Sequence, residues 1–173
     1  SVADTTLEML VHMHTLNVVP TFLCAREAVR SMRASGAGGR IVNVAAKPVI
    51  SPASGMLAYA ASKAAVTCFT ESLQLNLVKD DAALRASVFY PSGGLLDTGL
   101  YTAARNRPAH LQRQGEGTGR AGMTFDQLKA FVAQQTGSEP PVADLDELGE
   151  FVADEVAARR FVIAHDLDAT AAL

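Results

Sequence analysis

The sequence has no tryptophan and only two cysteines, and aromatic residues make up 6% of its 173 positions. Charge is also scarce. Charged residues account for 19%, and 15 Lys and Arg against 18 Asp and Glu leave a net charge of −3. Nucleic acid and anionic lipid surfaces both require a basic face, so this balance argues against either partner. Hydrophobic residues make up 49% of the chain, enough for a folded domain with its own core.

Long apolar runs are absent as well. No uninterrupted stretch approaches the ~18 residues of a membrane-spanning helix, so no membrane association is expected. The opening SVADTTLEML has no basic segment followed by an apolar one, and no signal peptide is predicted. Cys24 and Cys68 lie in apolar helical patterns without a metal-type CxxC spacing, so we expect reduced thiols in the core. The expected compartment is the cytoplasm.

Short β-branched runs alternate with helical patterns along the chain. Strands are predicted over residues 40–44, 84–90 and 161–164. Helices are predicted over residues 5–34, 58–78, 124–134 and 145–158. The first helix is expected to start at a capping box of Thr5 and Glu8 and to kink at Pro20. This alternation is typical of an α/β fold whose strands are parallel neighbours in one sheet, and the polar residues 103–123 are predicted to form a loop.

The motif with chemical content is Tyr59-Ala-Ala-Ser-Lys63. Residues four apart on a helix face the same side, so the phenol and the ammonium are expected to be neighbours. A free phenol has a pKa near ~10, and a nearby cation favours the phenolate, so Lys63 is expected to lower the pKa of Tyr59. Such a pair is suited to proton transfer. The pattern alone is weak evidence, because Tyr and Lys are common on amphipathic helices.

The residues around this motif are more specific. A strand ending in Asn43-Val-Ala-Ala46 precedes it, the next strand runs into Pro91-Ser-Gly-Gly, and Asn17 lies near the expected kink. In this arrangement the chain resembles the short-chain dehydrogenase/reductase family over essentially its whole length. The resemblance implies an α/β, Rossmann-like doubly wound parallel sheet. It also implies a single domain, residues 1–173, in which residues 92–140 form a substrate-side loop and helix region.

The resemblance implies roles for individual residues. Tyr59 would be the acid–base group, while Lys63 would lower its pKa and bind the nicotinamide ribose. Asn17 would hold a proton-relay water through its backbone at the kink. The implied cofactor is NAD or NADP, and the implied substrate is a small molecule. The residues expected to line the cofactor are Asn43, Tyr59, Lys63, Pro91, Gly93 and Thr98, with Thr98 the less secure match because Ser92 replaces the usual Gly.

One position departs from the family pattern. The catalytic Ser normally lies thirteen residues before the Tyr, where this chain has Ala46. Losing one such hydrogen-bond donor typically costs ~2.7–4 kcal/mol of transition-state stabilisation. Three interpretations are open: a natural variant, because Ala46-Lys47 is similar to dihydropteridine reductase-like members, an engineered replacement, or a protein without redox chemistry. We favour the natural variant, with Ser51 or Ser54 as alternative hydroxyls.

A second departure concerns the nucleotide. The family binds its cofactor at a Gly-rich turn after the first strand, within βαβ units that would precede Ser1. The expected architecture is therefore the C-terminal portion of the fold, without those units. The GxGxxG string at residues 117–122 follows no predicted strand and is interpreted as a chance match. No metal site is predicted, because none of the histidines has ligand spacing: His12, His14, His110 and His165.

Partners and alternative functions follow from the same features. The resemblance implies a homodimer or homotetramer that forms through the first two long helices. The second of these helices has small residues on one face. Arg105, Arg107 and Arg113 are interpreted as solvated loop residues. The leading function is an NAD(P)-dependent oxidoreductase that interconverts a carbonyl and an alcohol. The alternatives are a non-catalytic assembly subunit and a cofactor-independent lyase or isomerase that uses Tyr59 and Lys63.

Overall fold

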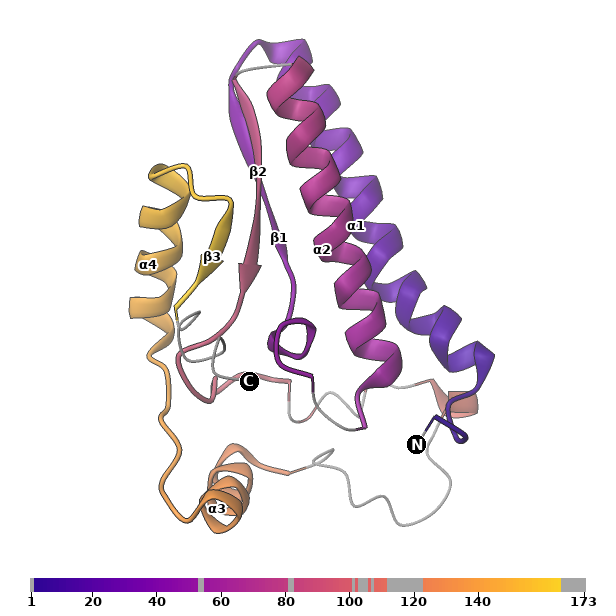
Figure 1. Cartoon of the computed structure of the whole chain (residues 1–173), viewed down its shortest axis with the longest axis vertical. Helices are drawn as coiled ribbons and strands as arrows, with labels where there is room; N and C mark the ends of the chain where they lie inside the picture. The colour runs from indigo at the N-terminus through magenta and orange to yellow at the C-terminus, as the bar shows by residue number, and fades with distance from the viewer. Residues whose placement is uncertain are drawn as a thin grey trace. The chain divides into compact units, whose positions relative to one another are not determined.

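The computed structural model describes residues 2–52, 55–80, 83–100, 102, 106, 108–111 and 123–165 (Figure 1). The chain divides into two compact units: Ser1–Ser92 with Glu150–Leu173, and Gly93–Gly149. Along the chain the helices and strands are α1 (Leu7–Ser35), β1 (Gly39–Val44), α2 (Leu57–Asp80), β2 (Leu84–Tyr90), α3 (Phe125–Thr136), α4 (Leu145–Ala157) and β3 (Val162–Ala164). Within the described residues, no helix is both long and apolar enough to cross a membrane.

The strands of the first unit form one parallel sheet in the order β1-β2-β3. In the register, Gly39 is opposite Leu84, Val44 is opposite Phe89, and Tyr90 is opposite Ala164. The predicted parallel α/β arrangement is confirmed, and β2 has the predicted bounds. Parallel neighbours need a crossover connection, and α2 supplies it between β1 and β2. The carboxyl ends of the strands therefore lie at one edge of the sheet.

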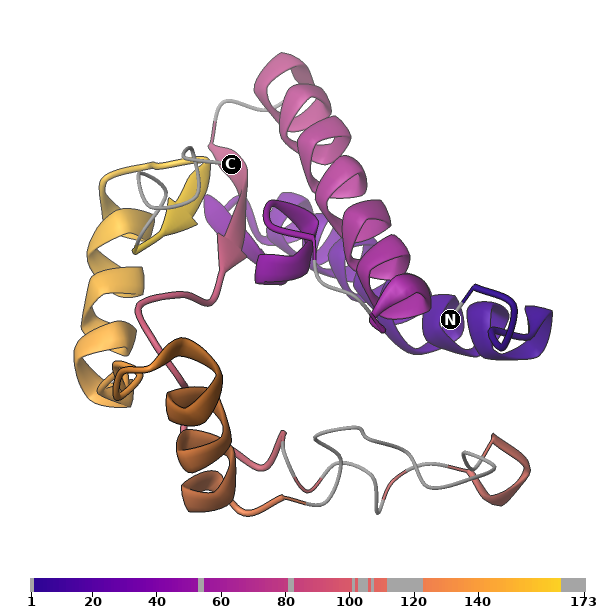
Figure 2. The same cartoon turned by 60° about the horizontal axis from the view of Figure 1, so that its bottom comes forward.

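The helix α1 begins one residue later than the predicted capping box. Thr6 is its N-cap, and the Thr6 hydroxyl accepts a 3.1 Å hydrogen bond from the Met9 backbone N–H. Two consecutive threonines offer the same acceptor, so the sequence alone does not choose between them. The helix continues through Pro20 to Ser35, and Gly36 ends it with a positive φ of 65°. Its N-terminal turns diverge from α2 (Figures 1 and 2).

Two apolar clusters pack on the sheet: the first holds α1 and α2 against it, and the second holds the 3-10 turn Lys47–Val49 and the segment around β3. In the first, the buried side chains of Leu77, Leu84 and Ala86 pack against Val29, Met32, Ile41 and Leu73. In the second, buried Ala45, Val88 and Tyr90 pack against Val49, Ile50, Phe161 and Ala164. Full burial of such a side chain is worth about 1.5–3 kcal/mol relative to exposure. The second cluster lies at the carboxyl ends of β1 and β2, where it supports the residues described below.

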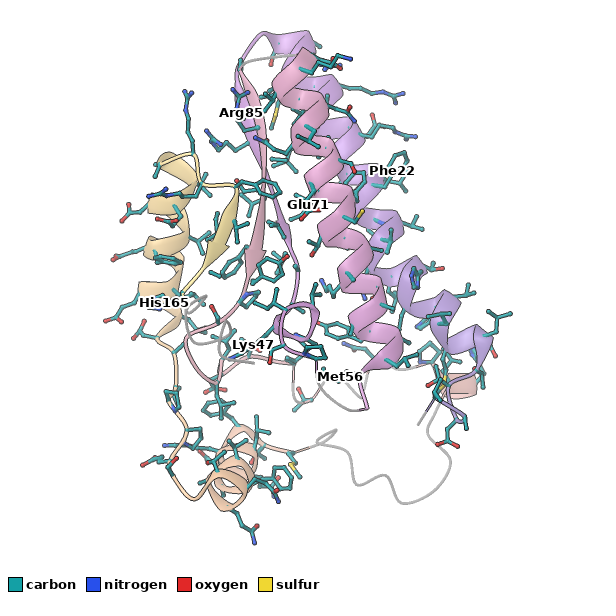
Figure 3. All side chains as sticks on the ribbon, in the orientation of Figure 1. Phe22, Lys47, Met56, Glu71, Arg85 and His165 are labelled. Carbon is teal, nitrogen blue, oxygen red and sulfur yellow. The ribbon has the colours of Figure 1, made fainter. Side chains whose placement is uncertain are left out.

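Both cysteines are free thiols, as predicted, but their predicted place in the core is wrong, because Cys24 on α1 and Cys68 on α2 are both exposed. The cause is that these helices also carry apolar residues on the face turned away from the sheet. Phe22, for example, is 46% exposed and lies on that side (Figure 3). When apolar residues occupy more than one face, the helical period does not tell which face meets the core.

In the second unit, backbone hydrogen bonds connect Leu95 to the segment Pro141–Ala143, so the two ends of residues 96–140 lie side by side. The Leu95 N–H donates to the Pro141 carbonyl at 2.8 Å, and the Ala143 N–H donates to the Leu95 carbonyl at 2.9 Å. Gly94 has a positive φ of 141°, and a Cβ there would lie 2.6 Å from the Pro141 oxygen, so no larger residue fits. The predicted substrate-side region, 92–140, lies almost wholly in this unit. Its contact with a substrate stays a prediction.

Candidate functional site

The motif of Tyr59 and Lys63 lies in the first two turns of α2, and both side chains are half-buried. The Lys63 ammonium donates a 2.9 Å hydrogen bond to the carbonyl of Val44, the last residue of β1. This contact places the ammonium at the carboxyl edge of the sheet. Figure 3 shows Lys47 and Met56 at the same end of the unit. Ligands of open α/β sheets bind outside this edge.

Burial sets the ionisation of the pair. It raises the pKa of Tyr59 above the ordinary 10.0 and lowers the pKa of Lys63 below the ordinary 10.5. The predicted lowering of the Tyr59 pKa by Lys63 is therefore wrong for this structure. The physical reason is that partial removal from water penalises the charged form of each group. At neutral pH Tyr59 is a neutral phenol and hence a proton donor.

The side chain of Asn17 contacts α2 at Ser62, three residues after Tyr59. Its amide donates a 2.9 Å hydrogen bond to the hydroxyl of Ser62, and that hydroxyl donates at 2.8 Å to the Tyr59 carbonyl. Ser62 is fully buried. The carbonyl of Asn17 accepts a 2.7 Å bond from the hydroxyl of Thr21. The role of that carbonyl in holding a relay water stays a prediction.

A second pair of hydrogen bonds ends on the backbone of Lys63. The hydroxyl of Thr67 donates to the Lys63 carbonyl at 3.2 Å, and the phenol of Tyr90 donates to the Thr67 hydroxyl at 3.2 Å. Sequence reasoning missed Ser62, Thr67 and Tyr90. The available signal was that Ser62 and Thr67 follow Tyr59 and Lys63 at the spacing at which hydroxyls bond helix carbonyls one turn back.

Asn43 and Ala46 lie on either side of the end of β1. The Asn43 amide donates a 3.0 Å hydrogen bond to the buried hydroxyl of Thr70 on α2, so its amide N–H is directed at this helix. Ala46 is buried and precedes the 3-10 turn Lys47–Val49, against which α2 packs. Participation of either residue in cofactor or substrate binding stays a prediction.

The predicted cofactor residues after β2 fall in both units. Pro91 closes the first unit together with Ser92, whose buried hydroxyl accepts a 2.9 Å hydrogen bond from the backbone N–H of His165. Gly93 and Thr98 belong to the second unit. Their contribution to a cofactor site therefore stays a prediction.

Of the remaining residues that the sequence analysis named, the structure describes Ser51 but not the loop residues. Ser51 is half-buried just after the 3-10 turn. Ser54, Arg105, Arg107, Arg113 and the string at 117–122 lie outside the described residues. In the part of the chain that the structure describes, no three His, Cys, Asp or Glu side chains are grouped to hold a metal ion.

A protein ammonium carries three N–H donors, and Val44 takes one of those of Lys63. The other two suit neutral hydroxyl acceptors, and the adjacent neutral phenol suits an oxygen that gains a proton. This set of donors can bind an oxygen-bearing ligand and transfer a proton to it.

Comparison of the sequence with known proteins gives three results. The sequence model of a family described as short chain dehydrogenase matches residues 1–108. The NADPH-dependent aldehyde reductase-like protein, chloroplastic, of Arabidopsis thaliana is 38% identical over 77 residues, which are 44% of this chain and 28% of that protein. The uncharacterized oxidoreductase YohF of Escherichia coli K12 is 32% identical over 88 residues, 49% of this chain and 35% of that protein.

A solved structure has the same fold. The crystal structure of a short chain dehydrogenase/reductase from Burkholderia phymatum in complex with NAD matches with a TM-score of 0.71 at 24% identity, over 92% of this chain and 54% of that one. At this identity the match shows the Rossmann-like fold. This chain spans about half the length of that protein, and its matched segments span about a third of the curated relatives.

Proposed function

Because the chain belongs to the short-chain dehydrogenase family, we propose that it acts as an NAD(P)-dependent oxidoreductase that interconverts a carbonyl and an alcohol. The observation that carries the proposal is the placement of Tyr59 and Lys63 one helical turn apart, with the Lys63 ammonium held at the carboxyl edge of the sheet. The NAD in the Burkholderia phymatum structure supports a nicotinamide cofactor. The proposed cofactor is either NAD or NADP.

A bound nicotinamide would supply the hydride that passes to or from the substrate carbon. Lys63 is the residue of this chain that would hold it. The bond to the Val44 carbonyl directs the ammonium, and its two other donors match the hydroxyls of a ribose. The remaining cofactor contacts are assigned to Asn43, Pro91, Gly93 and Thr98.

Tyr59 would move the proton. In the direction of reduction, the phenol donates its proton to the carbonyl oxygen of the substrate as the carbon receives hydride. Burial keeps the pKa of Tyr59 above its ordinary value, so the phenol is protonated at neutral pH and ready to donate. The hydrogen bond from Ser62 to the Tyr59 carbonyl holds this turn of α2 in place.

Ala46 is taken as native in this proposal. A buried methyl group at this position offers no hydrogen bond to the substrate oxygen. Tyr59 would then provide the hydrogen bond to that oxygen, and Ser51 is the described hydroxyl nearest in sequence that stands as an alternative.

The proposal includes a cytoplasmic protein that self-associates through α1 and α2. These helices expose apolar side chains that the sheet does not cover, including Leu16, Val19 and Phe22 on α1 and Leu75 and Val78 on α2. Most are spaced by three or four residues, so they recur on one side of each helix. A second copy of the chain would bury them in a homodimer or homotetramer.

The decisive experiment replaces Tyr59 by Phe in the complete protein. Phe keeps the ring and removes only the proton donor, so kcat should fall by about 10²–10⁴-fold. Nucleotide affinity, measured by calorimetry, should stay within about two-fold, because the variant leaves the Lys63 donors in place. The assay uses a panel of aldehydes and ketones with each nicotinamide nucleotide.

Other outcomes separate the alternatives. Full activity of the Tyr59→Phe protein would exclude the proposed mechanism. A wild-type protein that turns over no carbonyl compound and binds neither nucleotide would indicate an assembly subunit. Turnover without nucleotide would indicate a lyase or isomerase.

A further inference from the structure

Lys63 is held from two directions by the ends of neighbouring strands. Its ammonium donates to the carbonyl of Val44, the last residue of β1. Its own carbonyl accepts from Thr67, which in turn accepts from Tyr90, the last residue of β2. Val44 is opposite Phe89 in the sheet, so the two strand ends that hold Lys63 are adjacent.

The Tyr90 phenol controls which way the Thr67 hydroxyl points. A threonine hydroxyl has a single proton, and it rotates to whichever acceptor is best placed. When the Tyr90 O–H donates to the Thr67 oxygen, the Thr67 proton is left to point at the Lys63 carbonyl. The Tyr90 ring is itself 5% exposed and fixed by the buried side chains of Ala45 and Val88.

The same arrangement occurs one turn earlier in α2. There the Asn17 amide donates to the Ser62 hydroxyl, and the Ser62 hydroxyl donates to the Tyr59 carbonyl. Each residue of the motif therefore has a backbone carbonyl bonded to a hydroxyl that a donor from another element orients. For Tyr59 that donor comes from α1, and for Lys63 it comes from β2.

We propose that Tyr90 is a positioning residue that, through Thr67, sets the place of Lys63 at the cofactor side of the sheet. This inference rests on the proposed function, because it gives Lys63 the task of holding the nicotinamide nucleotide. Without the Tyr90 phenol, the Thr67 hydroxyl loses its fixed direction and the second turn of α2 loses its bond to β2. The bond between Lys63 and Val44 then has to hold the ammonium alone.

The test compares Tyr90→Phe, Thr67→Val and Thr67→Ser in the complete protein. Loss of one hydrogen bond should weaken nicotinamide binding about five-fold in Tyr90→Phe and in Thr67→Val, by calorimetry and as KM for the nucleotide. Thr67→Ser keeps the hydroxyl and therefore roughly the same hydrogen bonds. Its affinity for the nucleotide should stay within about two-fold of the wild-type value. The double variant Tyr90→Phe/Thr67→Val should be no weaker than Thr67→Val alone, because the two residues act through one chain of bonds.

Two further measurements separate positioning from general stability. The pKa of the Lys63 amine, followed by NMR on lysine-labelled protein, should move toward its ordinary 10.5 in Tyr90→Phe as the amine leaves its half-buried place. Ser35→Ala is the control, because the Ser35 hydroxyl also donates to a carbonyl of its own helix, that of Met32 at 3.1 Å, at the C-terminal end of α1. It should leave nucleotide affinity unchanged.

Unchanged nucleotide affinity and an unchanged Lys63 pKa in both Tyr90→Phe and Thr67→Val would overturn the positioning role, even where Tyr59→Phe is inactive. Additive effects in the double variant would overturn it as well. Thr67→Val keeps the test valid if Tyr90→Phe does not fold. Activity in Tyr59→Phe is a different failure, which removes the proposed function itself.

Discussion

The side-chain amide of Asn17 and the hydroxyl of Ser62 are joined by a 2.9 Å hydrogen bond between positions 45 residues apart in the chain. This bond links α1 to the buried face of α2. Because the Ser62 hydroxyl continues to the Tyr59 carbonyl at 2.8 Å, the link ends on the backbone of the residue proposed to move the proton. The first long helix therefore contributes to the site through a side chain.

The contribution of this link to stability is measurable with Ser62→Ala. The variant leaves the Asn17 amide without its acceptor in a partly buried place, and the free energy of unfolding should fall by about 1–3 kcal/mol. Urea denaturation followed by circular dichroism gives the value. Ser72→Ala is the control, because Ser72 is exposed on the same helix, and it should change the free energy of unfolding by less than about 0.5 kcal/mol. Equal effects of the two variants would contradict the role of Ser62.

The raised pKa of Tyr59 predicts an unusual alkaline titration. Burial favours the neutral phenol, so Tyr59 should ionise above the ordinary value near 10.0. Ultraviolet absorbance of the phenolate against pH would show this step, and Tyr59→Phe should remove it.

The same shift has a defined effect on stability. The folded-state pKa of Tyr59 lies above the unfolded one, so its favourable contribution is complete below about pH 10 and is lost as pH rises through the folded-state pKa. The stability difference between wild type and Tyr59→Phe should therefore change only in that alkaline range. A change between pH 5 and 8, where a phenol does not titrate, would contradict this assignment.

Ala46→Ser tests how the site works without the usual hydroxyl. If Ala46 is the native residue of an adapted site, the added hydroxyl should raise kcat/KM by much less than the ~10²–10³-fold expected for one oxyanion donor. We expect this small effect. The measurement is steady-state turnover of the best substrate from the carbonyl panel. A gain of the full size would instead identify Ala46 as the site of an inactivating replacement.

Ser92 replaces the Gly expected after Pro91, and its buried hydroxyl accepts the backbone N–H of His165, the residue after β3. Ser92→Ala should lower the free energy of unfolding by about 1 kcal/mol, the net value of one such bond. Thermal unfolding reports the change. Ser31→Ala, at an exposed position of α1, should leave the unfolding temperature unchanged. An unchanged temperature for Ser92→Ala would show that the bond contributes nothing.

The exposed apolar residues of α1 and α2 predict self-association. Phe22 packs edge-on against Phe69, with ring centroids 6.0 Å apart, yet 46% of its surface stays exposed. Phe22→Glu would place a charge in the interface and should convert a dimer or tetramer to a smaller species in sedimentation at micromolar concentration. Leu145→Glu changes an exposed apolar residue at the start of α4 and should leave the association state unchanged. A wild-type monomer would contradict the proposal.

Local features of the sequence were sufficient to predict the helices and strands and the placement of the Tyr59–Lys63 motif on one helix. Residues 84–90 are rich in apolar and aromatic side chains and end at Pro91, so β2 was predicted with its observed bounds. The spacing of Tyr59 and Lys63 placed both on one face of a helix, because a helical turn has nearly four residues. Parallel strand pairing followed from the alternation of strands and helices. The first two predictions depend on neighbours within a few positions, and the third depends on the order of strands and helices along the chain.

Only the tertiary structure decided what surrounds those residues. The partners of Asn17 and Tyr90 lie 45 and 23 positions away, and no local pattern specifies which distant hydroxyl a buried donor meets. The exposure of Cys24 depends on which apolar face of α1 meets the sheet. The pKa of Tyr59 is raised by desolvation, which is a property of the packed fold rather than of the spacing of two residues.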